Sequence, residues 1–412
     1  MACNRSLCHA SRISFLLIWR LGVLFCVAAP VLAATNTLAL LGSLGWIGSD
    51  AAGSTWLVAV VALAWLLLVT AIVIRGIRMT ANFQWVLVAI EYLLVLGFSV
   101  LAFARIAALH PAGSQAVQLW WFNPFSLQGL GGLAGGAVLG VFFFWGWDTA
   151  ANLNEESRDS NLVPGHAGVI SMFVLLVVFL FGASAVQALV PADTIAKQGG
   201  NALFYFAQQV LPAPWSYLMV LAVLASTVAT TQTTLLPATR LTFSMARDRV
   251  FPALFARVHP RFETPWVGTL VVAGVSAAGV LLTAASPSVN STFQNAISNI
   301  GVLVAVYYGL AGLACAWAFR RVLGRSPTVL LLAGVLPAAG GLFLLWIGYE
   351  VVRQAGLAAS LPVLVTLGLG IPLMLVAVAL NRTGFFRRGT VAYGTEARAA
   401  EGGEAAPEPS GT

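Results

Sequence analysis

The sequence predicts an all-α polytopic membrane protein, and two observations support this fold class. Of the 412 residues, 59% are hydrophobic and only 8% are charged, whereas about 25% of the residues of a soluble domain carry a charge. The apolar residues are also gathered in runs of about 20, the length that a helix needs to cross the hydrocarbon core of a bilayer. A large soluble core is therefore excluded.

We expect about ten such helices in a transmembrane domain that covers residues 13–380. The first run resembles a signal peptide that ends in small residues, but Arg20 interrupts its apolar region, and we favour a retained span. Residues 1–12 form a leader. Residues 381–412 are rich in Ala, Glu, Gly and Pro, cannot bury apolar surface and are expected to be disordered. The expected spans lie near residues 13–35, 55–75, 82–107, 128–151, 166–190, 215–238, 264–285, 295–319, 328–350 and 358–380.

The basic residues indicate how the chain is oriented in the membrane. Loops on one side hold only Arg105, Lys197 and Arg353, and the loops on the other side hold the remaining arginines. Because Lys and Arg gather in cytoplasmic loops, we expect a multi-pass protein of the plasma (inner) membrane with both termini in the cytoplasm. The net charge of +7 is thereby explained by topology and does not indicate a nucleic-acid partner.

The sequence contains no common catalytic motif. HExxH, a Walker-type phosphate loop and GxSxG are all absent. The four cysteines, Cys3, Cys8, Cys26 and Cys315, form neither a disulfide framework nor a metal-binding spacing. We therefore predict that the protein is not an enzyme and uses no cofactor or metal ion.

One span differs from the others and is the candidate for a functional site. It begins as a glycine-rich apolar run and ends in a charged segment. Near the expected midplane it contains Phe144, Trp145, Gly146, Trp147 and Asp148. Irregular backbone is tolerated at this depth only where protein or water satisfies it, and broken helices line the substrate sites of secondary transporters. We interpret the cluster as an unwound substrate site that Trp145 covers; the alternative is close helix packing through glycine.

Two acidic residues are expected inside the membrane, where an ionisable side chain is costly and functional by default. Asp148 favours a substrate that bears an amine. Glu91 lies between apolar runs and must be protonated or paired, as a proton-coupling group or as a hydrogen-bonded packing residue. Ser226 and Thr230 belong to a hydroxyl-rich band, which offers oxygen ligands to a substrate or to Na⁺, or serves helix packing.

Three pieces of the sequence resemble the amino acid–polyamine–organocation (APC) superfamily. GVFFFWGWDTAANLNEESRD is similar to the broken sixth span, residues 230–270 to the eighth span and its basic loop, and residues 298–321 to the tenth span. The resemblance covers most of residues 75–325 and implies an APC/LeuT-type inverted-repeat helical bundle. Counted from these pieces, the first apolar span corresponds to the family's third, so the bundle is expected to be amino-terminally shortened.

The resemblance implies a secondary active transporter, or permease, for amino acids or related organic amines. Such a transporter works by alternating access and is driven by a proton or exchange gradient. Glu91 falls near the position where some proton-coupled members carry a lysine, which implies a proton-coupling role. Gate ion pairs would join Glu155 and Glu156 to Arg240 and Arg247, or these residues are merely solvated. Tyr307 and Tyr308 face the substrate path from the tenth-type span or serve as interfacial packing residues, and we favour packing.

Two other functions stay open. In this fold the first and sixth spans hold the substrate together, so a chain without the first span is alternatively a transport-incompetent fragment of such a permease. A membrane scaffold or accessory subunit is the third possibility.

Overall fold

The computed structural model describes residues 26–124, 129–149, 162–247, 252–285 and 289–379. Most of these residues are helical, and no strand occurs among them, which confirms the predicted all-α class. Eight helices in the described ranges are long and apolar enough to cross a bilayer.

The helices follow one another through short connections. The long ones are an amino-terminal helix (Cys26–Ser43), α2 (Thr55–Ile74), α3 (Ile77–Leu109), α4 (Gly129–Phe143), α6 (Val163–Leu189), α9 (Leu218–Arg247), α10 (Trp266–Thr283), α11 (Val289–Phe319) and α13 (Leu336–Ala379). The connections contain η1 (Ser49–Gly53), η2 (Leu119–Phe122), α7 (Ala192–Gln198), η5 (Gly199–Asn201), α8 (Ala202–Val210), η6 (Trp215–Tyr217), η7 (Ala253–Ala256), η8 (Leu323–Arg325), α12 (Pro327–Val329) and the π-helical η9 (Leu330–Val335).

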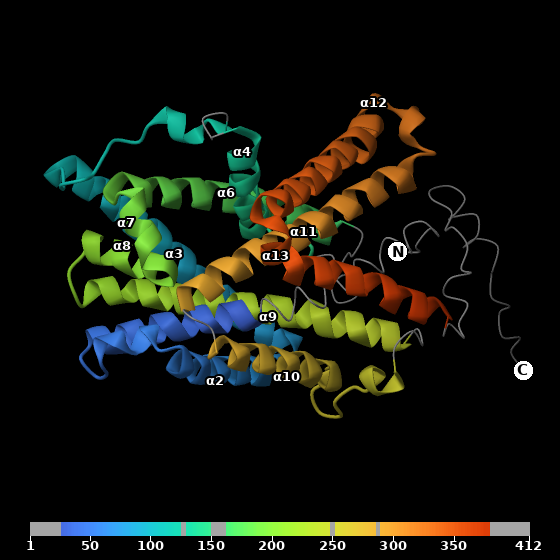
Figure 1. The fold of residues 1–412 in the computed structure, drawn as a ribbon, viewed down its shortest axis with the longest axis horizontal. Coiled ribbons are helices and arrows are strands. Elements are labelled where there is room, and N and C mark those ends of the chain that lie inside the picture. Colours follow the sequence, from blue (N-terminus) through green and yellow to red (C-terminus); the bar gives the residue numbers. More distant parts are fainter. Residues whose placement is uncertain (1–25, 125–128, 150–161, 248–251, 286–288, 380–412) are drawn as a thin grey trace, which may run out of the picture.

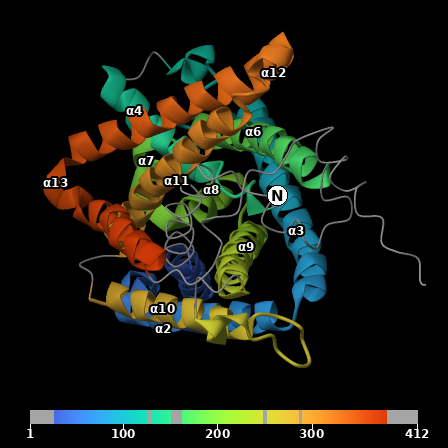
Figure 2. The same ribbon diagram turned by 90° about the vertical axis from the view of Figure 1, so that its right-hand side faces the viewer.

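The long helices form two groups. The first contains the amino-terminal helix, α2, α9 and α10, and the second contains α4, α11 and α13 (Figure 1, Figure 2). α3 packs against α9 of the first group and, on another side, against α6. Each group has its own apolar core, with Leu66 and Leu235 buried in the first and Ile300 and Ile347 in the second.

Glycines bring α11 and α13 into backbone contact. A Cβ atom added to Gly312 would lie 2.5 Å from the carbonyl oxygen of Pro337, and one added to Gly341 would lie 2.7 Å from a carbonyl oxygen of α11. A Cβ atom on Gly301 would likewise lie 2.9 Å from the carbonyl oxygen of Val138 in α4. Small residues allow such close approach of helices in a membrane, so α4, α11 and α13 form a tightly packed unit.

The helix bounds differ most from the expected spans in two places. α4 ends at Phe143 after 15 residues, and α9 continues to Arg247. The last two expected spans lie on either side of Gly356, where φ is 79° and α13 is kinked, and the first of the two begins in α12 and η9. Glycine adopts positive φ without the penalty that a Cβ atom brings, so the chain bends there without a loop. The start of the first expected span lies outside the described residues.

Candidate functional site

α4 ends within the stretch that the sequence singles out. Residues 144–148 form a turn, which is closed by the amide of Thr149 donating to the carbonyl oxygen of Gly146 (3.0 Å). At Gly146 φ is 120°, a conformation that suits glycine alone. A Cβ atom at Gly146 would meet no atom within 4 Å. Its conformation therefore explains this glycine, and close packing does not.

The carboxylate of Asp148 is held by two tyrosines of α11. The hydroxyl of Tyr308 donates to Oδ1 (2.9 Å), and the hydroxyl of Tyr307 donates to Oδ2 (3.2 Å). Both tyrosine side chains are half-buried against the apolar core of α11 and α13. An ionised carboxylate accepts hydrogen bonds and carries a negative charge. An ammonium group, which is a charged donor, is a suitable partner for it.

Tyr308 also connects this carboxylate to the backbone of the turn. Its hydroxyl accepts a hydrogen bond from the amide of Gly146 (3.2 Å) while it donates to Asp148. Its ring packs against that of Trp147, with the ring centroids 5.4 Å apart. The helix break, the intramembrane acid and α11 are thus one hydrogen-bonded unit.

A cavity of about 580 Å³ lies beside this unit. Trp147 and Tyr308 line it together with Phe144, Met172 of α6 and the glycine-rich faces of α11 and α13. Its size falls in the range of about 300–1,000 Å³ that small-molecule sites occupy, and such sites combine apolar walls with a few polar groups.

The other aromatic residues of the stretch point to different neighbours. Trp145 packs into the apolar core of α11 and α13 with Tyr307. The ring of Phe144 meets the ring of Phe179 in α6, with the ring centroids 5.6 Å apart. Of the two tryptophans that were predicted to belong to the substrate site, Trp147 lines the cavity. The covering role of Trp145 stays a prediction.

A second polar cluster lies between α3 and α9. The side chains of Glu91 and Ser226 are hydrogen-bonded to each other. Earlier in α3, the Gln84 amide donates to the carbonyl oxygen of Ala229 and to the side-chain oxygen of Gln232 (both 2.9 Å). The structure therefore brings two predicted site residues together, Glu91 and Ser226. Ser226 belongs to the first helix group and Glu91 to α3 beside it, whereas Asp148 contacts α11 of the second group.

The hydroxyl band of α9 bonds mostly within its own helix. The hydroxyls of Thr231, Thr233 and Thr234 donate to carbonyl oxygens one turn earlier, at 2.7, 3.0 and 2.7 Å. Thr230 is half-buried and supplies one of these carbonyl oxygens. Such back-bonding is common for threonine in helices. In the described part of the chain, Thr230 is not among the residues that line the cavity at Trp147.

The predicted gate is only partly within the described residues. Glu155 and Glu156 lie outside them. Arg240 is half-buried and Arg247 exposed at the end of α9, where the Arg247 guanidinium lies 6.0 Å from the centroid of the Phe243 ring. The gate ion pairs stay a prediction.

The sequence analysis favoured packing for Tyr307 and Tyr308 and missed their hydrogen bonds to Asp148. A buried tyrosine hydroxyl normally finds a partner, and an intramembrane acid needs one, so Asp148 could have been assigned to Tyr307 or Tyr308. An ion pair in α13 was missed as well. There the Nε atom of Arg353 donates to Oε2 of the buried Glu350 (2.9 Å), at the i, i+3 spacing typical of helix ion pairs.

Comparison with known proteins places the chain in a family. It matches the model of a family described as "Amino acid permease" over residues 10–379. It is 30% identical over 217 residues to the methylthioribose transporter of Bacillus subtilis (strain 168); the match covers 52% of this chain and 44% of that protein. It is 25% identical over 258 residues to the low-affinity putrescine importer PlaP of Escherichia coli (strain K12), covering 61% of this chain and 53% of the importer.

A third relative, the vacuolar cationic amino acid transporter 4 of Arabidopsis thaliana, is 29% identical over 163 residues, which are 38% of this chain and 25% of that protein. The chain spans about half the length of the first curated relatives that it matches. The family model, however, covers most of the sequence, and the helices are those of a multi-pass membrane protein. The chain therefore belongs to the amino acid permease family of membrane transporters, within the APC superfamily.

Proposed function

We propose that this protein is a secondary active permease that carries an amino acid or a related organic amine across the plasma (inner) membrane by alternating access. The observation that carries the proposal is the Asp148 carboxylate, held by two tyrosine hydroxyls at a helix break beside a cavity. Two relatives add support, since one is named for putrescine and one for cationic amino acids.

An ammonium group can compete with the tyrosines for Asp148. Hydrogen bonds between two charged groups are roughly twice as strong as those between neutral groups, so the amine has the advantage over a hydroxyl. Because the Tyr308 hydroxyl also accepts from the amide of Gly146, displacing it changes the hydrogen bonding of the turn. Substrate binding is thereby coupled to the shape of the helix break.

Glu91 is the proposed proton-coupling group. A carboxylate only accepts hydrogen bonds, whereas a carboxylic acid also donates one. Since Glu91 on α3 is bonded to Ser226 on α9, a change in its protonation alters a contact between these two helices. Exchange without a proton is the alternative mode of driving transport.

The remaining predicted residues complete the proposed transport cycle. Ser226 and Thr230 offer hydroxyls to the substrate path from α9. Ion pairs of Glu155 and Glu156 with Arg240 and Arg247 would close the cytoplasmic side. This scheme places both termini in the cytoplasm, as the distribution of arginines indicates.

Uptake by the purified protein in liposomes tests the proposal. The panel contains radiolabelled amino acids, putrescine and methylthioribose. Asp148→Asn removes the charge, and we expect it to reduce the affinity for an amine substrate by about tenfold or more, the effect of losing one charged hydrogen bond. Asp193→Asn is the matched control, because Asp193 is exposed in α7.

Absence of both uptake and exchange by well-folded protein, across the whole panel, would overturn the transport proposal. It would favour a transport-incompetent fragment. Co-purification of a second membrane protein would then favour the scaffold function.

A further inference from the structure

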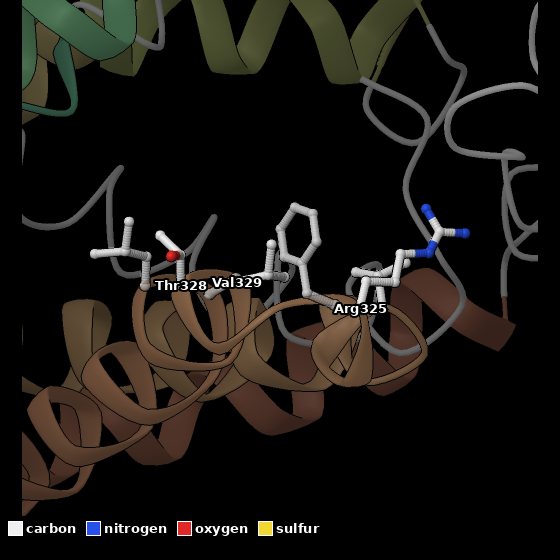
Figure 3. A pocket seen from close by; sticks show the side chains of 7 residues that line it. Arg325, Thr328 and Val329 are labelled. Atoms are coloured by element: carbon white, nitrogen blue, oxygen red, sulfur yellow. The ribbon is translucent and has the colours of Figure 1, made fainter.

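A second cavity, of about 400 Å³, lies where α11 turns into α12. Its walls are Phe319 and Val322 on one side and Val329, Leu332 and Ala333 on the other, with Arg325 and Thr328 as the polar lining. Figure 3 shows Thr328, Val329 and Arg325 along one face of this turn, with the guanidinium at one end. The cavity is therefore an apolar groove with a positive charge at its end.

This groove continues the helical faces that line the cavity beside Asp148. On α11, Tyr308, Gly312 and Cys315 line the cavity beside Trp147, and Phe319 lines the groove. These four residues follow one another at spacings of three or four, so they share one face of the helix. Val322 continues the lining in the turn after α11. α13 and η9 repeat the pattern, with lining residues from Leu344 to Leu332.

The length of this face matches one leaflet of a bilayer. Eleven residues separate Tyr308 from Phe319 in α11, which at 1.5 Å per residue gives about 16 Å. Half of the hydrocarbon core of a bilayer is about 15 Å thick. A single acyl chain that enters the groove beside Phe319 would therefore end close to Trp147 and Tyr308.

Arginines are concentrated at the open end of the groove. Arg320, Arg321 and Arg325 are all exposed. Among the residues that the structure describes, no acidic side chain forms an ion pair with any of the three. The Arg320 guanidinium lies 4.3 Å from the centroid of the Trp317 ring, and Trp317 is itself exposed. Exposed tryptophan beside arginine is typical of the level of the lipid head groups.

We propose that this groove binds an anionic phospholipid. Its phosphate would contact Arg325 and Arg321. One acyl chain would lie between α11 and α12–α13 and would reach the cavity that Trp147 lines. Basic pockets at the cytoplasmic end of membrane helices suit such head groups. An apolar groove one leaflet long distinguishes a lipid from a soluble anion, which would need only the arginines.

Lipid binding to the purified full-length protein tests this proposal and does not depend on transport. Native mass spectrometry compares the retention of phosphatidylglycerol with that of phosphatidylcholine of the same chain length. We expect a preference for phosphatidylglycerol that Arg325→Gln reduces by about fivefold, the contribution of one basic residue at a lipid surface. Arg325→Lys keeps the charge and should keep the preference. Arg257→Gln, a charge removed from an exposed loop position, should also leave it unchanged.

A second pair of variants tests the acyl-chain groove. Leu332→Trp fills it and should lower the retention of both lipids, whereas Leu342→Trp, at a side chain with the same exposure of 60% outside the lining, should not. Phosphatidylglycerol with a diazirine in the acyl chain should label Cys315 and Leu332. Labelling spread evenly over exposed residues of α6, or a preference that Arg325→Gln leaves intact, would overturn the proposal. The proposal would also be overturned if inorganic phosphate displaced phosphatidylglycerol as well as unlabelled phosphatidylglycerol does, because the site would then recognise a soluble anion.

Discussion

Replacing Tyr308 by phenylalanine isolates the hydroxyl that links the helix break to the intramembrane acid. The substitution removes one oxygen atom and two hydrogen bonds, one donated to Asp148 (2.9 Å) and one accepted from the amide of Gly146 (3.2 Å). A hydrogen bond to a charged group contributes about 1.5–3 kcal/mol and a neutral one about 0.5–1.5 kcal/mol. Their sum predicts that Tyr308→Phe lowers the free energy of unfolding by about 2–4.5 kcal/mol.

Tyr307→Phe is the matched control for this prediction. Tyr307 donates to the same carboxylate at 3.2 Å, whereas the bond from the Gly146 amide goes to Tyr308, so the effect of Tyr307→Phe should be smaller by about 1 kcal/mol. Chemical denaturation of both variants in the same detergent measures the difference. A double-mutant cycle of Tyr308→Phe with Asp148→Asn should show an interaction energy of about 0.5–3 kcal/mol. Strict additivity, or a larger effect at Tyr307, would refute the role assigned to the Tyr308 hydroxyl.

Three further predictions concern the break, the glycine contact and the proton. Gly146→Ala places a side chain at φ 120° and should destabilise the fold by about 1–3 kcal/mol, measured as thermal stability; an unchanged stability would show that the turn is not strained by a Cβ atom. Gly312→Val directs its side chain at the Pro337 carbonyl oxygen and should cost about 1–3 kcal/mol or more, unlike Gly135→Val, which meets open space. Glu91→Gln should abolish proton-driven uptake in liposomes while sparing exchange, and unchanged proton dependence would contradict its role.

The fold class could be predicted because a bilayer imposes a simple rule on the sequence. Each spanning helix must be apolar over about 20 residues, so α2, with bounds Thr55–Ile74, is visible as an apolar run between polar ends. The kink between the last two expected spans could not be predicted. The apolar runs end and begin near Gly356, but how the two segments of α13 are turned relative to each other depends on their packing against α11 and α4.

The sequence could indicate which residues belong to the candidate site, but not which of them contact one another in the folded protein. Asp148 is conspicuous because a charge is rare among aromatic residues inside a membrane. Its partners lie about 160 residues later, and their identity depends on how α11 is rotated against α4. The same limit applies to Glu91 and Ser226, whose contact depends on how α3 and α9 pack. Local patterns indicate which residues need a partner, and the tertiary structure supplies it.

The glycine contact between α11 and α13 has a mechanical consequence. The backbones of the two helices are in contact at Gly312 and Gly341, and no side chains separate them there. We therefore expect the two helices to move together as one rigid body. A tilt of about 10° about Tyr308 would swing Phe319, about 16 Å along α11, by about 3 Å. A small rotation at the tyrosine end is in this way amplified at the membrane surface. Distances from probes placed near Tyr308 and near Phe319 to a fixed point in the first helix group would report this motion directly.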